Sequence, residues 1–219
     1  MKEVWIVGAG KFGRLAFERL SERRKDTHFV LIDPDGTTLS RCYGNRLIKE
    51  QADGVAFLDR HLDRRNEPDW IIPALPIHLA AEWVLHRLGP ERIRRVEIPS
   101  ELDPLLPNPI HGQTGDVYVT HAEFICPDDC AEPRGICTMT GEKRKQNMFE
   151  VLGEIALKPF QSLVIRSHQL APGIGGYRPA HLHALLEALK KAAGPFLIST
   201  ACRCHGVITG LEKVPHEIK

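Results

Sequence analysis

The stretch Val4-Trp5-Ile6-Val7-Gly8-Ala9-Gly10-Lys11-Phe12-Gly13 decides the fold of the first half of the chain. Its apolar start is typical of a buried β-strand and runs directly into glycines spaced as G-x-G-x-x-G. Apolar residues then recur at helical spacing from Phe12 to Leu20. The stretch therefore predicts a strand, a tight glycine turn and a helix, in that order.

Each glycine of this turn has a physical task. Gly8 permits the tight turn, Gly10 lets the backbone approach a pyrophosphate, and Gly13 lets the helix pack closely on the strand. The start of the helix offers unpaired amide groups and the positive end of its dipole to phosphates. The predicted cofactor-binding residues of the turn are Gly8, Ala9, Gly10, Lys11, Phe12 and Gly13.

Asp33 completes this pattern, because it ends the next apolar run twenty residues after Gly13. A carboxylate at that place accepts hydrogen bonds from ribose hydroxyls and repels a 2′-phosphate. The sequence therefore predicts a dinucleotide site that prefers NAD to NADP. FAD, which uses a similar first turn, is the alternative cofactor.

The order of the remaining segments predicts an α/β fold with two units. Strand-like runs at 28–32, 54–58, 70–75 and 93–98 alternate with helix-like segments, which indicates βαβ units in a parallel sheet of Rossmann type. A stretch rich in Pro, Gly and Asn at 103–115 is the predicted boundary. We expect an NAD-binding Rossmann domain over residues 1–102 and a smaller cysteine-containing C-terminal domain, α/β or α+β, over residues 116–219.

The N-terminal region, residues 3–100, resembles NAD(P)-binding Rossmann domains. The glycine stretch together with Val30-Leu31-Ile32-Asp33 is similar to the nucleotide-binding regulators of potassium transport. The segment from Asp69 to His78 is similar to two-domain NAD dehydrogenases, in which a Pro-containing turn lies beside the nicotinamide. The second resemblance implies that Leu75, Pro76 and His78 lie near the cofactor. The segment departs from the dehydrogenase pattern at the end of its strand, where the usual Thr or Ser is absent.

Composition limits the classes of partner. The chain has 219 residues, with 29 Lys and Arg against 28 Asp and Glu, a net charge of +1. Nucleic-acid binders usually carry a basic excess, so we expect no nucleic-acid partner. No apolar run reaches the roughly 20 residues of a membrane span, so we expect no membrane insertion and a cytoplasmic protein. The glycine turn makes a small molecule the expected ligand. The residues leave a homo-oligomer open.

Five of the six cysteines fall into two groups, which predicts a metal site. A chain commonly closes a four-ligand site with thiols from one loop and thiols from a distant turn. Zinc and an iron–sulfur cluster both accept four thiolates, and unligated thiols or a redox pair of Cys126 with Cys130 are the alternatives. Cys42 is expected to be an ordinary buried thiol. The predicted ligands, one of them in excess, are Cys126, Cys130, Cys137, Cys202 and Cys204.

A second glycine loop, Gly173 to Gly176, lies before a predicted helix at 180–191. Its amides, with Arg178, could hold an anion, although glycine-rich turns are common without ligands. His168 is the histidine best placed for acid–base chemistry, since it lies between a predicted strand and this loop.

Three functions fit these residues. The first is an NAD-dependent oxidoreductase whose second unit carries the cysteine site and closes over a small substrate. The second is a regulatory protein that senses NAD(H) without catalysis, and a thiol- or metal-responsive binding module is a third reading. The sequence names neither a substrate nor a catalytic residue.

Overall fold

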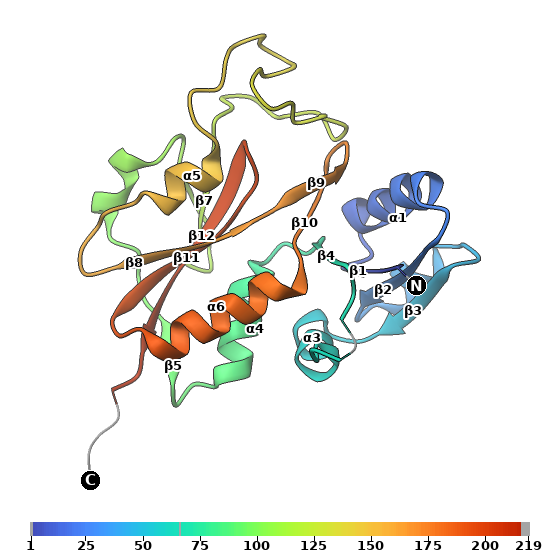
Figure 1. Cartoon of the computed structure of the whole chain (residues 1–219), viewed down its shortest axis with the longest axis horizontal. Coiled ribbons are helices and arrows are strands. Elements are labelled where there is room, and N and C mark those ends of the chain that lie inside the picture. The colour runs from blue at the N-terminus through green and yellow to red at the C-terminus, as the bar shows by residue number, and fades with distance from the viewer. Residues whose placement is uncertain (1, 66, 216–219) are drawn as a thin grey trace.

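The computed structural model describes residues 2–65 and 67–215, which form a four-stranded sheet, a six-stranded sheet and a two-stranded hairpin (Figure 1). The first part of the chain contains β1 (Lys2–Val7), α1 (Lys11–Arg23), β2 (Thr27–Asp33), α2 (Gly36–Ser40), β3 (Leu47–Gln51), α3 (Gly54–His61), β4 (Trp70–Pro73) and α4 (Leu79–Leu88). The second part contains β5 (Ile93–Arg95), the 3-10 helix η1 (Ser100–Leu105), β6 (Ile110–His111), β7 (Val117–Thr120), α5 (Met148–Gly153), β8 (Gln161–Arg166), β9 (His168–Ala171), β10 (Ile174–Gly176), α6 (Pro179–Lys191), β11 (Pro195–Ala201) and β12 (His205–Lys213).

The four-stranded sheet is parallel throughout and has the order β3-β2-β1-β4, so the α/β class predicted from the sequence is confirmed. The strand predicted at 54–58 is wrong, because α3 occupies that segment and the third strand is β3. Asp53 explains the difference: its side chain accepts a hydrogen bond from the Ala56 amide at 2.9 Å and caps the helix. The buried Phe57 and Leu58 therefore belong to a helix face.

The six-stranded sheet has the order β6-β7-β12-β11-β8, and β5 also pairs with β12. The predicted strand at 93–98 therefore forms only over β5, and it joins this second sheet antiparallel to β12 instead of the parallel sheet. β8 and β11 are parallel, whereas the other pairings are antiparallel. The sheet of the second half, expected in the smaller unit, has more strands than the first.

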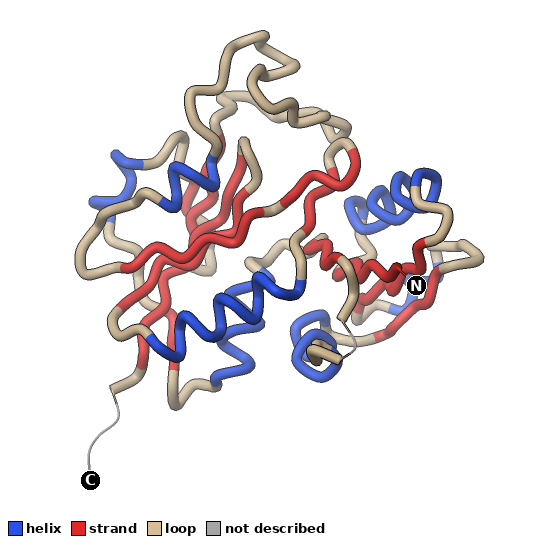
Figure 2. The backbone as a smooth tube through the Cα atoms, viewed as in Figure 1, coloured by secondary structure: helices blue, strands red, loops and turns tan. Residues whose placement is uncertain are grey.

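One stretch of extended chain connects the two sheets. β8 pairs with β11 in the second sheet and continues, after Ser167, into β9 of the hairpin (Figure 2). The hairpin then returns through β10 to Tyr177, which exchanges backbone hydrogen bonds with Ile71 of β4 at 2.9 and 3.0 Å. This places the hairpin tip near the start of α1.

The two sheets also share a hydrophobic core. Residues of β1, α3 and β4 pack in one cluster with residues of α4, α6, β11 and β12. Trp83 of α4 and Tyr177 are among its largest fully buried side chains. A separate cluster fills the other face of the second sheet beneath η1 and α5. Among the described residues, no helix is both long enough and apolar enough to cross a bilayer.

Candidate functional site

The glycine turn lies where β1 ends and α1 begins, at the carboxyl edge of the parallel sheet. Gly8 has a φ of +105°, and a Cβ there would lie 2.5 Å from the carbonyl oxygen of Ala74. A Cβ on Gly13 would lie 1.8 Å from the carbonyl oxygen of Gly8, so only glycine permits this approach of helix to turn. Gly10 differs from both, because a Cβ there would meet nothing within 4 Å. Space therefore lies open beside Gly10, where the sequence predicted a pyrophosphate.

Asp33 lies next to this turn at the end of β2. Its Oδ2 atom accepts a hydrogen bond from the Ala9 amide at 2.7 Å, and its Oδ1 atom accepts one from the Asp35 amide at 2.9 Å. The half-buried carboxylate thereby holds the turn against the second strand. Each of its oxygens keeps further lone pairs, so the group still has acceptor capacity for a ribose hydroxyl.

A cavity of about 370 Å³, here called the motif cavity, lies beside the turn. Phe12 of α1 lines it, together with Leu75 and Pro76 from the segment after β4. These residues were predicted near a cofactor on two separate grounds, and the fold brings them to one place. Gly173 of the hairpin turn and the first two residues of β10 also line this cavity.

The loop between β7 and α5 carries the first three clustered cysteines and runs over the molecule toward the β9–β10 hairpin (Figure 1). Its residue Asp128 forms an ion pair with Lys11 of α1. Arg19 of α1 donates to the Asp128 carbonyl at 2.8 Å and to the Pro172 carbonyl at 2.7 Å. Gly173 also donates to the Cys130 carbonyl at 2.9 Å. The cysteine loop is thus fastened both to the helix of the glycine turn and to the hairpin.

Two further cavities border this loop. The first, of about 370 Å³ and here called the hairpin cavity, shares Phe12 and the hairpin turn with the motif cavity. The second, of about 670 Å³ and here called the cysteine cavity, shares three cysteines with the hairpin cavity. The thiols common to both are those of Cys126, Cys130 and Cys204. Shared walls therefore connect the glycine turn with the cysteines.

The fourth cysteine of each cavity differs: Cys137 lines the cysteine cavity, and Cys202 lines the hairpin cavity. Burial raises the pKa of Cys126, and the neighbouring thiols of Cys130 and Cys137 raise it further. Burial raises the pKa of Cys204 too, with a smaller effect from Cys130. These electrostatic effects group Cys137, and not Cys202, with the three shared thiols.

Hydrogen bonds to the sulfur favour the thiolate of Cys137 and oppose the effect of burial at Cys204, whose pKa stays raised. Hydrogen bonds from the amides of Thr140 and Met139 lower the pKa of Cys137. The guanidinium of Arg144 donates to Cys204 Sγ at 2.9 Å. Hydrogen-bond donors of both kinds favour the ionised sulfur that metals bind.

Cys202 has different surroundings. Its sulfur accepts hydrogen bonds from the amides of Cys204 and His205, both at 3.3 Å, and lies 3.9 Å from His205 Nδ1. Burial nevertheless raises the pKa of Cys202 to about 12, and the buried carboxylate of Glu132 contributes to that rise. This thiol is therefore held in its protonated form.

The thiols surround a common space but do not converge on one point. Within residues 2–65 and 67–215, no three His, Cys, Asp or Glu side chains are arranged so that they could hold a metal ion. The donor chemistry suits a soft ion, since thiolates are the preferred ligands of zinc and iron–sulfur clusters. Ligation would require the side chains around the cysteine cavity to close inward.

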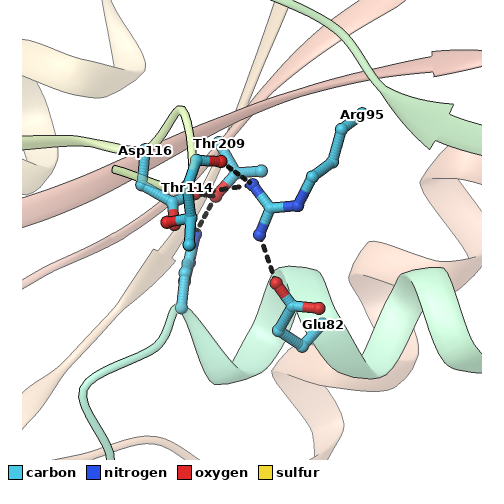
Figure 3. A network of polar contacts seen from close by, with 6 residues as sticks. Glu82, Arg95, Thr114, Asp116 and Thr209 are labelled. Atoms are coloured by element: carbon cyan, nitrogen blue, oxygen red, sulfur yellow. Dashed lines mark hydrogen bonds and ion pairs between the residues drawn. The ribbon is translucent and has the colours of Figure 1, made fainter. Parts of the chain in front are cut away.

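His78, placed near the cofactor by resemblance, belongs to a buried polar network at the start of α4. Its Nδ1 lies 2.7 Å from Thr209 Oγ1, and its Nε2 lies 2.9 Å from Thr200 Oγ1. The Thr209 hydroxyl donates to the Asp116 carboxylate at 2.5 Å, so it accepts from the Nδ1–H of a neutral imidazole. Arg95 joins Asp116 to Glu82 of α4 (Figure 3). The network thereby connects α4 and β5 with β12.

We expect this network to make stability depend on pH. Burial lowers the pKa of His78 to about 4, so between that value and its unfolded pKa of about 6.5 the unfolded chain binds more protons. Stability from this group is present above the unfolded pKa and is lost as the pH falls toward 4. The expected loss is about 2 kcal/mol between about pH 7.5 and about pH 5, measured by urea denaturation. His78→Gln should remove that part of the pH slope, and an unchanged slope would refute the assignment.

Sequence reasoning missed several residues that the fold brings to the site. Glu132 is a buried residue with a φ of +44°, and its carboxylate accepts from the Arg203 amide at 2.5 Å. Asp128 and Arg19 connect the cysteine loop with α1, and Arg144 of that loop contacts the Cys204 thiol. His168, the histidine that the sequence predicted to be best placed for acid–base chemistry, stacks on His181 with ring centroids 6.1 Å apart, close to Trp70. The sequence around Cys126 and Glu132 gave no signal for these contacts, because the partners lie on distant segments of the chain.

The fold and the site together define an α/β protein with a glycine turn at the edge of a parallel sheet and a cysteine loop fastened above it. Residues 80–214 match the model of the family described as "Uncharacterized protein, C-terminal domain", and the chain belongs to this family. A protein of Archaeoglobus fulgidus, described as "Uncharacterized protein", is 29% identical over 223 residues, which cover 95% of this chain and 98% of the relative. No solved structure matches the chain. The family segment begins in α4 and includes all five clustered cysteines.

Proposed function

We propose that this protein binds NAD(H) at the glycine turn and is an oxidoreductase that acts on a small substrate. One observation carries the proposal: the turn is open at Gly10 and closed at Gly13, beside the carboxylate of Asp33. This combination leaves room for a pyrophosphate at the start of α1 and places an acceptor for ribose hydroxyls next to it. The strand order β3-β2-β1-β4 supports the proposal, because it is the order of the first four strands of a Rossmann sheet.

The protein groups would divide the work with the cofactor. Amides at the start of α1 would hold the phosphates, and the motif cavity with Leu75 and Pro76 would hold the end of the dinucleotide. NAD(H) supplies hydride transfer when bound, whereas the chain positions it and excludes water. The hairpin cavity continues from there toward the thiols, and we propose it as the substrate space.

The cysteines form the second part of the proposal. We propose that Cys126, Cys130, Cys137 and Cys204 bind zinc or an iron–sulfur cluster, because all four line the cysteine cavity. Zinc would fasten the loop, and a cluster would exchange electrons with a cofactor. Cys202, the fifth predicted ligand, would keep a free thiol beside the substrate space.

The nucleotide proposal predicts a charge-dependent affinity. Titration of the purified protein with NADH should give saturable fluorescence changes, and Asp33→Asn should weaken binding by roughly tenfold, since a hydrogen bond to a charged group is lost. Asp33→Arg should weaken NADH binding further and favour NADPH relative to NADH, because the guanidinium attracts a 2′-phosphate. The matched control is Asp26→Asn, an exposed residue at the other end of β2, which should leave the affinity unchanged.

The outcomes of this titration are distinct. No saturable response to NADH or NADPH in the folded protein would refute the binding of NAD(H). Tight binding of FAD alone would identify FAD as the cofactor instead. Binding without oxidation of NADH by ferricyanide, in protein with its full metal content, would favour the regulatory reading.

A further inference from the structure

A third group of side chains, away from the glycine turn, gathers around a cavity of about 350 Å³, here called the arginine cavity. Arg134 comes from the cysteine loop, Arg166 ends β8, and Arg203 lies in the turn between β11 and β12. Three distant segments of the chain therefore bring an arginine each to the wall of one space. Ser167 and Gln169 add hydrogen-bonding groups to the wall.

The wall of this cavity carries more positive than negative charge. Among the described residues, none of the three arginines forms an ion pair with a carboxylate within 4.0 Å. Glu132 is the one acidic residue on the described wall, and its carboxylate accepts a hydrogen bond from the backbone amide of Arg203. The side chain of Arg203 donates instead to the Glu132 carbonyl, at 3.3 Å.

Two further contacts show how these charges lie. The guanidinium carbon of Arg166 lies 4.2 Å from the centroid of the Phe149 ring, a cation–π contact that uses none of its N–H donors. Burial lowers the pKa of His168, which lines the cavity, and the charges of Arg166, His181, Arg178 and Arg203 lower it further. Several cations therefore surround the same space.

We propose that the arginine cavity binds a small oxyanion, a carboxylate or a phosphate group of a small molecule. The three arginines share the wall with a single carboxylate, so their charges repel one another, and a bound anion would reduce that repulsion. Planar guanidinium forks match carboxylate and phosphate oxygens in pairs, which suits this set of donors better than it suits a halide. The chain as a whole has a net charge of only +1, so the concentration of cations here is local.

The arginine cavity is separate from the nucleotide site. Glu132 and Gln169 line both the arginine cavity and the hairpin cavity, whereas no residue of the glycine turn lines the arginine cavity. A molecule anchored by its anionic group would therefore extend toward the proposed substrate space. The proposal itself does not require NAD(H) to bind.

Calorimetric titration of the full chain with inorganic phosphate and, separately, with malonate tests this proposal at low ionic strength. We expect saturable binding of at least one anion, and the stronger of the two identifies phosphate or carboxylate as the ligand group. Arg166→Gln and Arg203→Gln should each weaken binding at least tenfold, about the effect of losing a charge-assisted hydrogen bond. Arg166→Lys should bind the anion with an affinity between those of the wild type and Arg166→Gln, because lysine keeps the charge and loses the planar guanidinium fork.

Two controls fix the place of binding. Arg23→Gln removes an exposed arginine at the end of α1 and should leave the affinity unchanged. Gly10→Ala alters the glycine turn and should also leave it unchanged, although it should weaken NADH. Circular dichroism confirms that each variant folds. The proposal is wrong if neither anion binds saturably, if Arg23→Gln weakens binding as much as Arg166→Gln, or if Gly10→Ala alone abolishes it.

Discussion

Replacement of Gly13 by alanine is expected to lower the free energy of unfolding by about 3 kcal/mol. The new Cβ would lie 1.8 Å from the carbonyl oxygen of Gly8 and 3.5 Å from a methyl group of Ile6. The first of these is a backbone atom, so α1 must move away from β1 and disturb the buried residues between them. Urea denaturation followed by circular dichroism should show this loss, together with a midpoint temperature lowered by roughly 6–12 °C.

Gly10→Ala is the matched control in the same turn. A Cβ at Gly10 would meet nothing within 4 Å, so stability should change by less than about 0.5 kcal/mol. The methyl group would nevertheless fill the space proposed for the pyrophosphate and should weaken NADH binding at least about tenfold. Equal stability of the two variants would mean that α1 does not pack on the turn as described.

The second large effect is expected in the cysteine cavity. Protein purified without oxygen should contain about one equivalent of zinc, or a visible absorption band with iron. Cys137→Ser should lower the affinity for the metal by well over tenfold, because a weaker ligand replaces a thiolate. Cys126→Ser, Cys130→Ser and Cys204→Ser should behave alike, since these thiols line the same cavity.

Cys202→Ser provides the comparison that discriminates. Three thiols line both cavities, so the fourth ligand is Cys137 if the cysteine cavity closes and Cys202 if the hairpin cavity closes. We expect Cys202→Ser to keep its metal, as should Cys42→Ser, which alters a thiol buried elsewhere. Metal loss in Cys202→Ser but not in Cys137→Ser would mean that Cys202 is the fourth ligand and Cys137 the free thiol. Absence of zinc and iron from folded, wild-type protein would refute the metal site.

Local signals made much of the fold predictable. The glycine turn and the helix predicted at 180–191 both lie where the sequence indicated. The failure at 54–58 arose because Val55, Phe57 and Leu58 suit a buried strand as well as a helix, and the cap of Asp53 decided between them. β5 could not be assigned to a sheet from its residues, since its partner β12 lies more than a hundred positions away.

The candidate site divides in the same way. Residues of the glycine turn were identified because their spacing is short and each has a separate task. The meeting of Cys204 with Cys126 and Cys130 was expected in outline, but which thiols share a cavity depends on how the loop lies over the hairpin. Glu132 and Arg166 gave no signal, because their significance comes from partners on other segments.

The ion pair between Lys11 and Asp128 has a thermodynamic consequence. Lys11 begins the helix that would receive phosphates, and Asp128 lies between two of the proposed metal ligands, so a ligand that draws either charge away alters the energy of the other segment. Coupling between two binding equilibria is reciprocal. If metal bound at the thiols changes the affinity for the dinucleotide by some factor, the bound dinucleotide must change the affinity for the metal by the same factor. Loss of metal from the loop would then change the affinity for the dinucleotide at the start of α1.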